Sequence, residues 1–283
     1  MRAVATSAEL RAALKAARRT GTAVGFVPTM GALHAGHRSL LAAARRETGF
    51  VVASIFVNPL QFGPSEDLAS YPRDLAGDLE VMERDGVDLV LTPEPAEMWP
   101  RPPVVRLSAG AFGARLEGAL RPGHLDGVAT VVAKLFNLVG PCRAYFGRKD
   151  AQQLAMVRRM AADLGFPVEV VACPTVREPD GLALSSRNAY LSAAERRRAT
   201  ALSRGLRAGL DAWLAGEREP AKIEGAAAAV LDATPGIETQ YVALVEPEGF
   251  EPSPTAEAGH VLAVAARVGR TRLIDNMVLE EPA

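Results

Sequence analysis

The sequence predicts an α/β protein in which a doubly wound parallel sheet is followed by a smaller α+β domain. Apolar runs of strand length alternate with amphipathic helical segments up to about residue 172, a pattern typical of parallel strands connected by helices. Beyond residue 190, two helical segments precede three strand-like runs, which is the order of a small α+β domain. At 283 residues the chain is also long for one hydrophobic core, so two domains are expected.

The first domain is expected to begin with a helix over residues 7–19, with Ser7 as its N-cap. A buried strand follows over residues 24–27, and Pro28 is expected to end its ladder because proline has no N–H to donate. The next helix is expected to begin at His37. Further strands are expected over residues 50–57, 87–91, 104–107, 143–147 and 168–172, and further helices over residues 73–84, 124–139 and 151–164.

The segment REPDG at residues 177–181 marks the predicted boundary, so the domains are expected to span residues 1–176 and 177–283. Ser192 is expected to cap a long helix in the second domain. The predicted fold class is therefore α/β, a Rossmann-like doubly wound sheet with a smaller C-terminal α+β domain. Its second part is expected to contain helices over residues 193–214 and 220–231 and antiparallel strands over residues 239–245, 260–268 and 271–278.

Composition excludes several classes of protein. The net charge of −1 argues against a surface that coats nucleic acid and against a polybasic membrane anchor. The 2 cysteines form no CxxC motif, which fits a reducing compartment. The N-terminus reads as a charged helix start without the apolar core of a signal peptide, and the best apolar run, residues 51–57, is only strand-sized. A cytoplasmic protein with no nucleic-acid or membrane partner is expected.

The turn between the strand at residues 24–27 and the following helix is the first candidate site. A strand, a glycine-containing turn and a helix present backbone N–H groups and a positive helix end to an anion. His34 and His37 lie in this turn with Gly36 between them, which predicts a phosphate site with two proton-carrying side chains. Two alternatives stay open, a metal-binding His-x-x-His pair without a third ligand and a hydrogen-bonded structural histidine.

A second candidate site follows the strand at residues 50–57. In open parallel sheets the carboxyl ends of the strands carry the ligands. Asn58, Gln61 and Tyr71 are therefore placed where a small polar substrate could be held, with turn formation as the alternative role. Arg121 and His124 are cationic candidates at a helix N-terminus, where a cation is unfavourable unless an anion also binds.

Two further loops carry charged or hydroxyl side chains. Gly147, Lys149 and Gln153 repeat the arrangement of a strand end, a glycine and a helix start, although a solvated charged turn would look the same. The loop at residues 184–188 holds two hydroxyls and Arg187, whose planar guanidinium suits a phosphate.

Five segments occur together in the order of one known family: PTMGALHAGHRSLL, FVNPLQF, RPGHLDGVATVV, FGRKDAQQL and TVREPDGLALSSRNAYLS. The first resembles the HIGH-type signature of the nucleotidyltransferase superfamily, and SSRN resembles the counterpart of its KMSKS loop. Over nearly its whole length the chain resembles the pantoate–β-alanine ligase (pantothenate synthetase) family. The resemblance implies ATP-dependent ligation of pantoate and β-alanine to pantothenate through a pantoyl adenylate, with release of pyrophosphate and AMP.

The resemblance also implies roles for individual residues. Catalysis would depend on His37 as proton donor, with His34, Lys149 and Arg187. Pantoate would be held by Gln61 and Gln153, with Gln61 also beside β-alanine, while Asn58 and Tyr71 stay substrate-binding candidates from their place after the strand at residues 50–57. ATP would be bound by Met30, Gly31, His34, Gly36, His37, Gly147, Lys149, Asp150, Val176, Leu184, Ser185, Ser186 and Arg187.

The family further implies a homodimer, and Mg²⁺ is expected with ATP, without a protein ligand of its own. The loop at residues 184–187 is expected to cover ATP and keep water from the adenylate. Two other functions stay open, an adenylyltransferase that leaves the nucleotide on its product and a non-catalytic ATP-binding sensor. Gln61 and Gln153 disfavour the adenylyltransferase because they resemble a pair that binds an acid.

Overall fold

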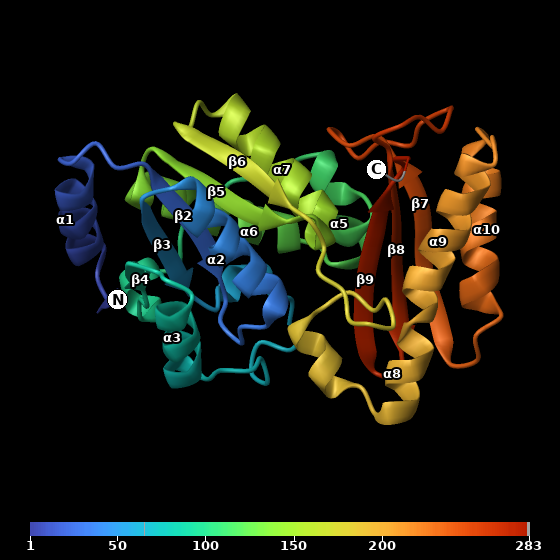
Figure 1. Cartoon of the computed structure of the whole chain (residues 1–283), viewed down its shortest axis with the longest axis horizontal. Helices are drawn as coiled ribbons and strands as arrows, with labels where there is room; N and C mark the ends of the chain where they lie inside the picture. Colours follow the sequence, from blue (N-terminus) through green and yellow to red (C-terminus); the bar gives the residue numbers. More distant parts are fainter. Residues whose placement is uncertain (65, 282–283) are drawn as a thin grey trace. The chain divides into compact units, whose positions relative to one another are not determined.

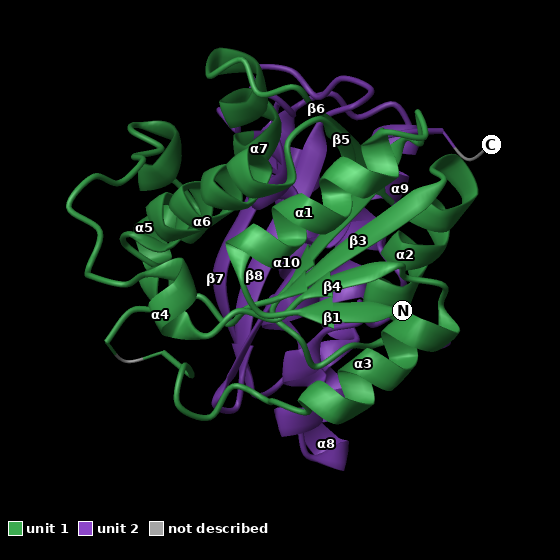
Figure 2. Ribbon diagram, turned by 90° about the vertical axis from the view of Figure 1, so that its left-hand side faces the viewer, with its two compact units in different colours: residues 1–147, 156–173 green, residues 148–155, 174–283 purple. Residues whose placement is uncertain are grey.

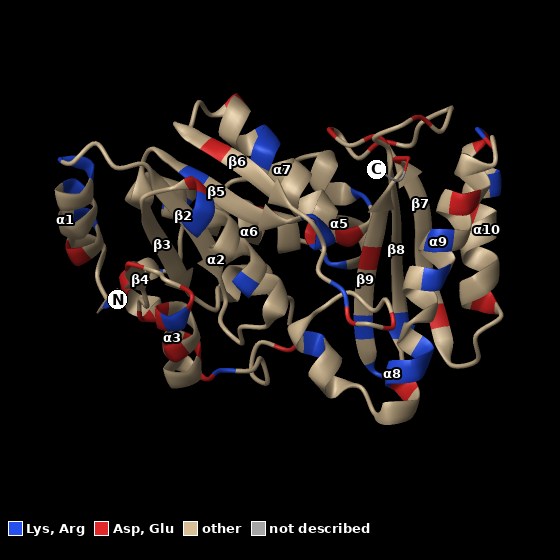
Figure 3. Ribbon diagram, in the orientation of Figure 1, with Lys and Arg blue, Asp and Glu red and all other residues tan. Residues whose placement is uncertain are grey.

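The computed structural model describes residues 1–64 and 66–281 of the chain (Figure 1). These residues form two compact units, one of residues 1–147 and 156–173 and the other of residues 148–155 and 174–283 (Figure 2). The helix α7 (Ala151–Asp163) contributes to both units. Basic and acidic residues are scattered over both units, and three arginines gather on the short helix α8 (Figure 3).

The first unit is built on a six-stranded sheet in which every pair of neighbouring strands is parallel. The strand order is β1-β4-β3-β2-β5-β6, so the predicted doubly wound sheet is confirmed. The strands are β1 (Arg2–Val4), β2 (Val24–Thr29), β3 (Phe50–Ile55), β4 (Leu89–Leu91), β5 (Cys142–Gly147) and β6 (Val168–Cys173).

Helices pack on this sheet through apolar faces. Leu41 and Ala44 of α2 are fully buried beside Val27 of β2 and Val51 of β3. Burial of each leucine or valine side chain contributes roughly 1.5–3 kcal/mol. The helical segments are α1 (Ser7–Arg18), α2 (Ala35–Glu47), η1 (Pro59–Gln61), α3 (Leu75–Arg84), α4 (Pro95–Met98), η2 (Phe112–Ala114), α5 (Glu117–Leu120) and α6 (His124–Val139).

The prediction that Pro28 ends its strand is wrong, because β2 pairs with β3 from Val24 to Thr29. The Thr29 carbonyl accepts the Phe56 N–H, just after β3, at 3.0 Å. The backbone of the preceding residue, Pro28, therefore faces away from β3, toward β5. Pairing with β5 covers only Gly25 and Phe26, so the donor that proline lacks is not needed.

Other boundaries also differ from the prediction. The cap of α1 is Thr6 rather than Ser7, because the Thr6 side chain accepts the Glu9 N–H. The strand predicted at residues 104–107 is absent, and Val104 is 98% exposed. The short edge strand β1 was not predicted, since its three residues carry no periodic pattern. The helix α2 begins at residue 35, two residues before its predicted start.

The second unit contains the predicted antiparallel sheet, and its strand order is β7-β8-β9. Figure 1 shows α9 and α10 side by side along this sheet. Ser192 caps α8 as predicted, but the expected long helix divides in two at Thr200. The elements are η3 (Arg148–Asp150), η4 (Ser186–Tyr190), α8 (Ala193–Ala199), α9 (Ala201–Leu214), α10 (Pro220–Asp232), β7 (Ile237–Val245), β8 (Val261–Val268) and β9 (Thr271–Val278).

Among residues 1–64 and 66–281, no helix is both long enough and apolar enough to cross a membrane.

Candidate functional site

The strand order places a topological switch point beside β2. From β2 the chain continues to β3 and β4 on one side, whereas β5 and β6 lie on the other side. In open parallel sheets the crevice outside the carboxyl ends of the strands at this point is where ligands bind. The segments that follow β2 and β3 carry the predicted residues from Met30 to His37 and from Asn58 to Gln61.

The turn after β2 is held in shape by Asp78 of α3. The Asp78 carboxylate accepts the backbone N–H of Ala32 at 2.9 Å and that of Leu33 at 2.8 Å. Gly31 and Ala32 both have positive φ angles, 83° and 52°, and a Cβ at Gly31 would lie 2.7 Å from Asp78 Oδ2. A left-handed alanine is strained, so the carboxylate stabilises a turn that the chain alone disfavours. Sequence reasoning missed Asp78, whose signal is a polar residue on the buried face of a helix, one turn before the buried Met82.

His34 and His37 present the same ring nitrogen to the protein. His34 is the N-cap of α2, and its Nδ1 accepts the Gly36 N–H at 3.1 Å. The Nδ1 of His37 accepts the His34 N–H at 3.3 Å. An Nδ1 that accepts a hydrogen bond carries no proton, so in each neutral ring the proton is on Nε2. The centroids of the His34 and His37 rings are 4.2 Å apart, so the two Nε2–H donors belong to adjacent rings.

The start of α2 supports an anion next to these rings. The first turn contains no acidic residue, and its N–H groups point along the helix axis toward the turn. The helix macrodipole places positive potential there. Gly36 adds no side chain to the first turn, so a ligand can approach the backbone.

Asn58 and Gln61 form a buried amide pair. Asn58 donates from Nδ2 to Gln61 Oε1 and to the Gly127 carbonyl, each at 3.1 Å, and its Oδ1 accepts from Trp99 Nε1 at 3.2 Å. Because Gln61 Oε1 is an acceptor in this pair, Gln61 Nε2 is oriented as a donor, 3.2 Å from Met30 Sδ. Asn58 is only 1% exposed, so it orients Gln61, which fits the turn-forming role that the sequence left open.

Arg121 and His124 are engaged by the protein itself. Arg121 pairs with both carboxylate oxygens of Glu66, at 2.7 and 2.5 Å, and approaches His124 Nε2 at 3.0 Å. His124 Nδ1 lies 2.8 Å from the Gln61 carbonyl oxygen, which can only accept, so this ring carries its proton on Nδ1. Burial, and then the Arg121 charge, lower the pKa of His124. The positive charge at this helix start is therefore balanced by Glu66, and His124 is held neutral.

Tyr71 is buried and packs edge-on against Phe62, with ring centroids 5.9 Å apart. Gly147 ends β5, where it pairs with Cys173. Both residues belong to the first unit, together with Met30, Gly31, His34, Gly36, His37, Asn58 and Gln61.

The second unit carries the remaining predicted residues on two segments. Lys149 and Asp150 lie in η3, with Lys149 Nζ 3.5 Å from Asp150 Oδ1, and the half-buried Gln153 follows in the first turn of α7. The other segment is a hairpin in which Leu184 donates its N–H to the Val176 carbonyl at 3.0 Å. It leads into η4, where the Ser185 hydroxyl accepts the Arg187 N–H at 3.3 Å. Ser186 is half-buried between these two residues.

Within the described parts of the chain, no group of three or more His, Cys, Asp or Glu side chains could hold a metal ion. Mg²⁺ keeps several of its waters and is commonly bound by substrate phosphates with one or two carboxylates. Asp150, next to Lys149, is the carboxylate among the predicted nucleotide-binding residues.

The fold and these side chains define a class of protein. A doubly wound sheet with two histidines at a helix start beside its switch point is the framework of an α/β enzyme that binds a phosphate-bearing ligand.

Comparison with known proteins identifies the family within this class. The family model described as pantoate-beta-alanine ligase matches residues 2–278. A pantothenate synthetase of Roseiflexus sp. (strain RS-1) is 52% identical over 280 residues, covering 99% of this chain and all of that protein. The chain belongs to the pantoate–β-alanine ligase family.

Solved structures agree with this assignment. The pantothenate synthetase from Thermus thermophilus matches with a TM-score of 0.94 and 52% identity, over 99% of this chain and 100% of that one. The pantoate-beta-alanine ligase from Francisella tularensis, described as complexed with beta-gamma ATP and beta-alanine, matches with a TM-score of 0.82 and 30% identity. That match covers 100% of this chain and 99% of the Francisella chain.

Proposed function

We propose that this chain ligates pantoate and β-alanine to pantothenate, converting ATP to AMP and pyrophosphate through a bound pantoyl adenylate. In the first step a pantoate carboxylate oxygen bonds to the α-phosphorus of ATP, and the bond to the pyrophosphate leaving group breaks. In the second step the β-alanine nitrogen bonds to the acyl carbon, AMP leaves with the former carboxylate oxygen, and the amine proton passes to solvent. Family membership and the Francisella complex with beta-gamma ATP and beta-alanine support this assignment.

The observation that carries this proposal is the hydrogen bond that each Nδ1, of His34 and of His37, accepts from the backbone. Because both Nδ1 atoms accept backbone N–H groups, each neutral ring carries its proton on Nε2, and these Nε2–H groups are proposed to donate to the negative charge that develops on the phosphates. His37 is the proposed proton donor to this charge. A donor fixed before the reaction costs no reorganisation, and one well-placed donor lowers the barrier by roughly 3 kcal/mol.

Gln61 is proposed to bind the pantoate carboxylate or hydroxyl through Nε2, the end of its amide that Asn58 leaves as a donor. Gln153 and Tyr71 are proposed as further substrate contacts. Lys149 and Arg187 are proposed to neutralise phosphate charge, and the loop at residues 184–187 is proposed to cover ATP. Mg²⁺ would accompany the ATP phosphates and supply additional charge there.

Two further parts of the proposal are a homodimer, which the family resemblance implies, and a cytoplasmic location, which the cysteine usage favours. Sedimentation at several protein concentrations tests the first, since a monomer at all of them would exclude a stable dimer.

The decisive experiment measures pyrophosphate release from ATP with pantoate alone and then with β-alanine added. A pantoate-dependent burst that becomes steady turnover with β-alanine, with AMP and pantothenate as products, is expected. Adenylyl transfer without amide formation would support an adenylyltransferase instead. ATP binding without any release of pyrophosphate would overturn the proposal in favour of a nucleotide sensor.

A further inference from the structure

The strand β9 carries two adjacent buried polar residues, Asp275 and Asn276, to which the proposed reaction assigns no role. They are 2% and 6% exposed. Neighbouring side chains on a strand point to opposite faces of the sheet, so the two residues reach different surroundings. Buried polar groups at adjacent positions are costly unless each is well paired.

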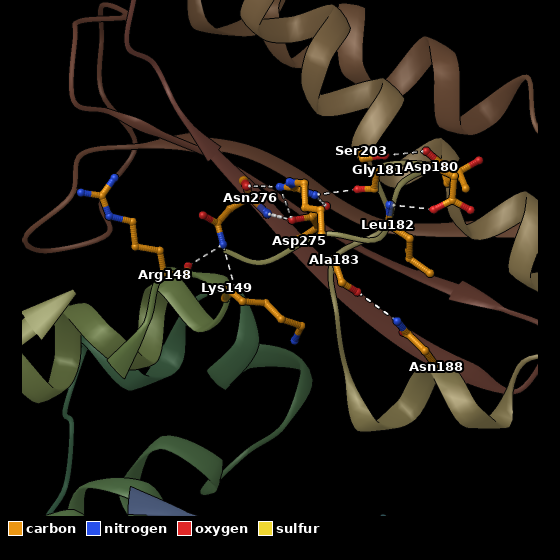
Figure 4. A network of polar contacts seen from close by, with 12 residues as sticks. Arg148, Lys149, Asp180, Gly181, Leu182, Ala183, Asn188, Ser203, Asp275 and Asn276 are labelled. Carbon is orange, nitrogen blue, oxygen red and sulfur yellow. Dashed lines mark hydrogen bonds and ion pairs between the residues drawn. The ribbon is translucent and has the colours of Figure 1, made fainter. Parts of the chain in front are cut away.

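Asn276 holds the segment that carries Lys149. Its Nδ2 donates to the Arg148 carbonyl at 2.9 Å and to the Lys149 carbonyl at 2.8 Å, as the dashed lines in Figure 4 show. The two hydrogens of one amide thus bind two successive carbonyls of the three-residue turn η3. In Figure 4 the side chains of Arg148 and Lys149 leave this turn in different directions, so its orientation decides where the Lys149 ammonium lies.

Asp275 holds the hairpin that leads to Ser185 and Arg187. Its carboxylate accepts from Arg177 Nη1 at 2.6 Å and from Arg177 Nη2 at 2.9 Å. The same guanidinium donates to the Gly181 carbonyl, which lies in the turn of this hairpin, and to the Asn276 carbonyl, each at 3.1 Å. Four hydrogen bonds from one planar group fix the hairpin to β9 with little freedom.

We propose that Asp275 and Asn276 are positioning residues that set the two proposed ATP-binding segments of the second unit from one strand. Asn276 acts through the backbone of Lys149, and Asp275 acts through Arg177 on the loop that carries Arg187. This inference rests on the proposed function, in which Lys149 and Arg187 meet the phosphates. Because Asp275 and Asn276 are adjacent on one rigid strand, they fix the positions of Lys149 and Arg187 more precisely than two separately anchored loops would.

The test is a double-mutant cycle on ATP affinity, measured by titration calorimetry of the full-length protein. Asn276→Ala should weaken ATP binding about tenfold in the wild-type background, the factor expected from loss of about one well-placed charge contact. In a Lys149→Ala background the same substitution should change affinity less than about twofold, because Asn276 acts through Lys149. Asp275→Asn should show the corresponding coupling with Arg187→Ala.

The control is Gln240→Ala on β7, which removes the bond from Arg272 Nε to Gln240 Oε1, 2.7 Å long, within the same sheet. It should leave ATP affinity unchanged. Equal losses for Asn276→Ala in both backgrounds, or no loss in either, would overturn the inference. If Asn276→Ala does not fold, Asn276→Ser supplies the test, since one hydroxyl can serve only one of the two carbonyls and should give an intermediate, Lys149-dependent loss.

Pyrophosphate release keeps this test separate from the proposed function. A wild-type protein that binds ATP but releases no pyrophosphate would contradict the ligase assignment while the coupling of Asn276 to Lys149 persisted. An active wild-type protein without that coupling would contradict only the positioning role.

Discussion

The chemistry of each histidine in the candidate site depends on which of its two ring nitrogens carries the proton. In His34 and His37 the backbone occupies Nδ1, so each neutral ring donates from Nε2, whereas His124 carries its proton on Nδ1 and donates to the Gln61 carbonyl. The sequence identified His34 and His37 because a local strand, turn and helix pattern surrounds them. It could not identify their tautomers, which depend on the path of the folded backbone.

Substitution of His37 tests the donor role. His37→Ala should lower the rate of pantoate-dependent pyrophosphate release roughly 100-fold or more, because a fixed donor to the phosphates is lost. His37→Gln, whose amide can donate from a position near Nε2, should retain more activity than His37→Ala. Both should unfold near the wild-type denaturant concentration. Near-normal turnover of His37→Ala would exclude the role.

The carboxylate of Asp78 is expected to matter for both stability and ATP use. Asp78→Asn leaves one acceptor for two backbone N–H groups and should lower the free energy of unfolding by about 2 kcal/mol. Ala32→Gly should recover part of this loss, because glycine adopts the positive φ at that position without strain. Asp74→Asn, at the N-cap of the same helix, is the control and should be nearly neutral, since asparagine also caps well. Denaturant unfolding together with the KM for ATP measures these effects, and equal stability of Asp78→Asn and wild type would contradict the assignment.

Burial and Arg121 lower the pKa of His124, which gives a definite sign to its effect of pH on stability. As pH falls below about 6.5, His124 becomes protonated in the unfolded state, while in the folded state its lowered pKa keeps the ring neutral. The contribution of His124 is therefore complete above the unfolded pKa and is lost as pH falls toward the lower folded pKa, with a slope of at most about 1.4 kcal/mol per pH unit. Glu66 and Glu117 also face this ring and oppose the shift.

Unfolding titrations from pH 5 to 7 on the wild type and His124→Asn measure this contribution. Asparagine can donate to the Gln61 carbonyl but does not titrate, so the variant should lose less stability than wild type as pH falls. Curves that stay parallel over this range would show that His124 does not titrate on unfolding.

At the scale of elements, close approach between α6 and η1 places Gln61. A Cβ at Gly127 would lie 2.2 Å from the Leu60 carbonyl oxygen and 2.7 Å from Gln61 Cα. The sequence predicted α6 with its bounds but gave no sign of this contact, because the two segments are more than 60 residues apart. Propensity alone would favour alanine over glycine within a helix.

Gly127→Ala is expected to push η1 away from α6. The free energy of unfolding should fall by roughly 1–3 kcal/mol through overpacking, and the KM for pantoate should rise because Gln61 moves. Gly225→Ala in α10 is the matched control, since no atom lies within 4 Å of the added Cβ, and it should be neutral or stabilising. An unchanged KM for pantoate in Gly127→Ala would show that the contact between α6 and η1 does not affect pantoate binding.

Across the whole molecule, the sequence predicted what local patterns encode and missed what distant segments supply. The alternation of strands and helices predicted the parallel sheet, and three consecutive strand-like runs predicted the antiparallel one. Glycine-bearing strand ends drew attention to His37 and Lys149. Asp78 and Asn276 escaped notice because each serves a turn 45 or more residues away in the chain. Their only local signal is a polar side chain on a buried face, which becomes informative once the partner is known.

Metal dependence can be predicted at the same scale. No group of three or more candidate ligands occurs within residues 1–64 and 66–281, so Mg²⁺ is expected to act with ATP and not as part of the fold. Chelation with EDTA should therefore stop pyrophosphate release, and added Mg²⁺ should restore it, while the unfolding temperature without ATP stays constant. A resident ion that binds only the folded state would raise that temperature by mass action. A drop in unfolding temperature on chelation in the absence of ATP would show a protein-held metal and contradict this prediction.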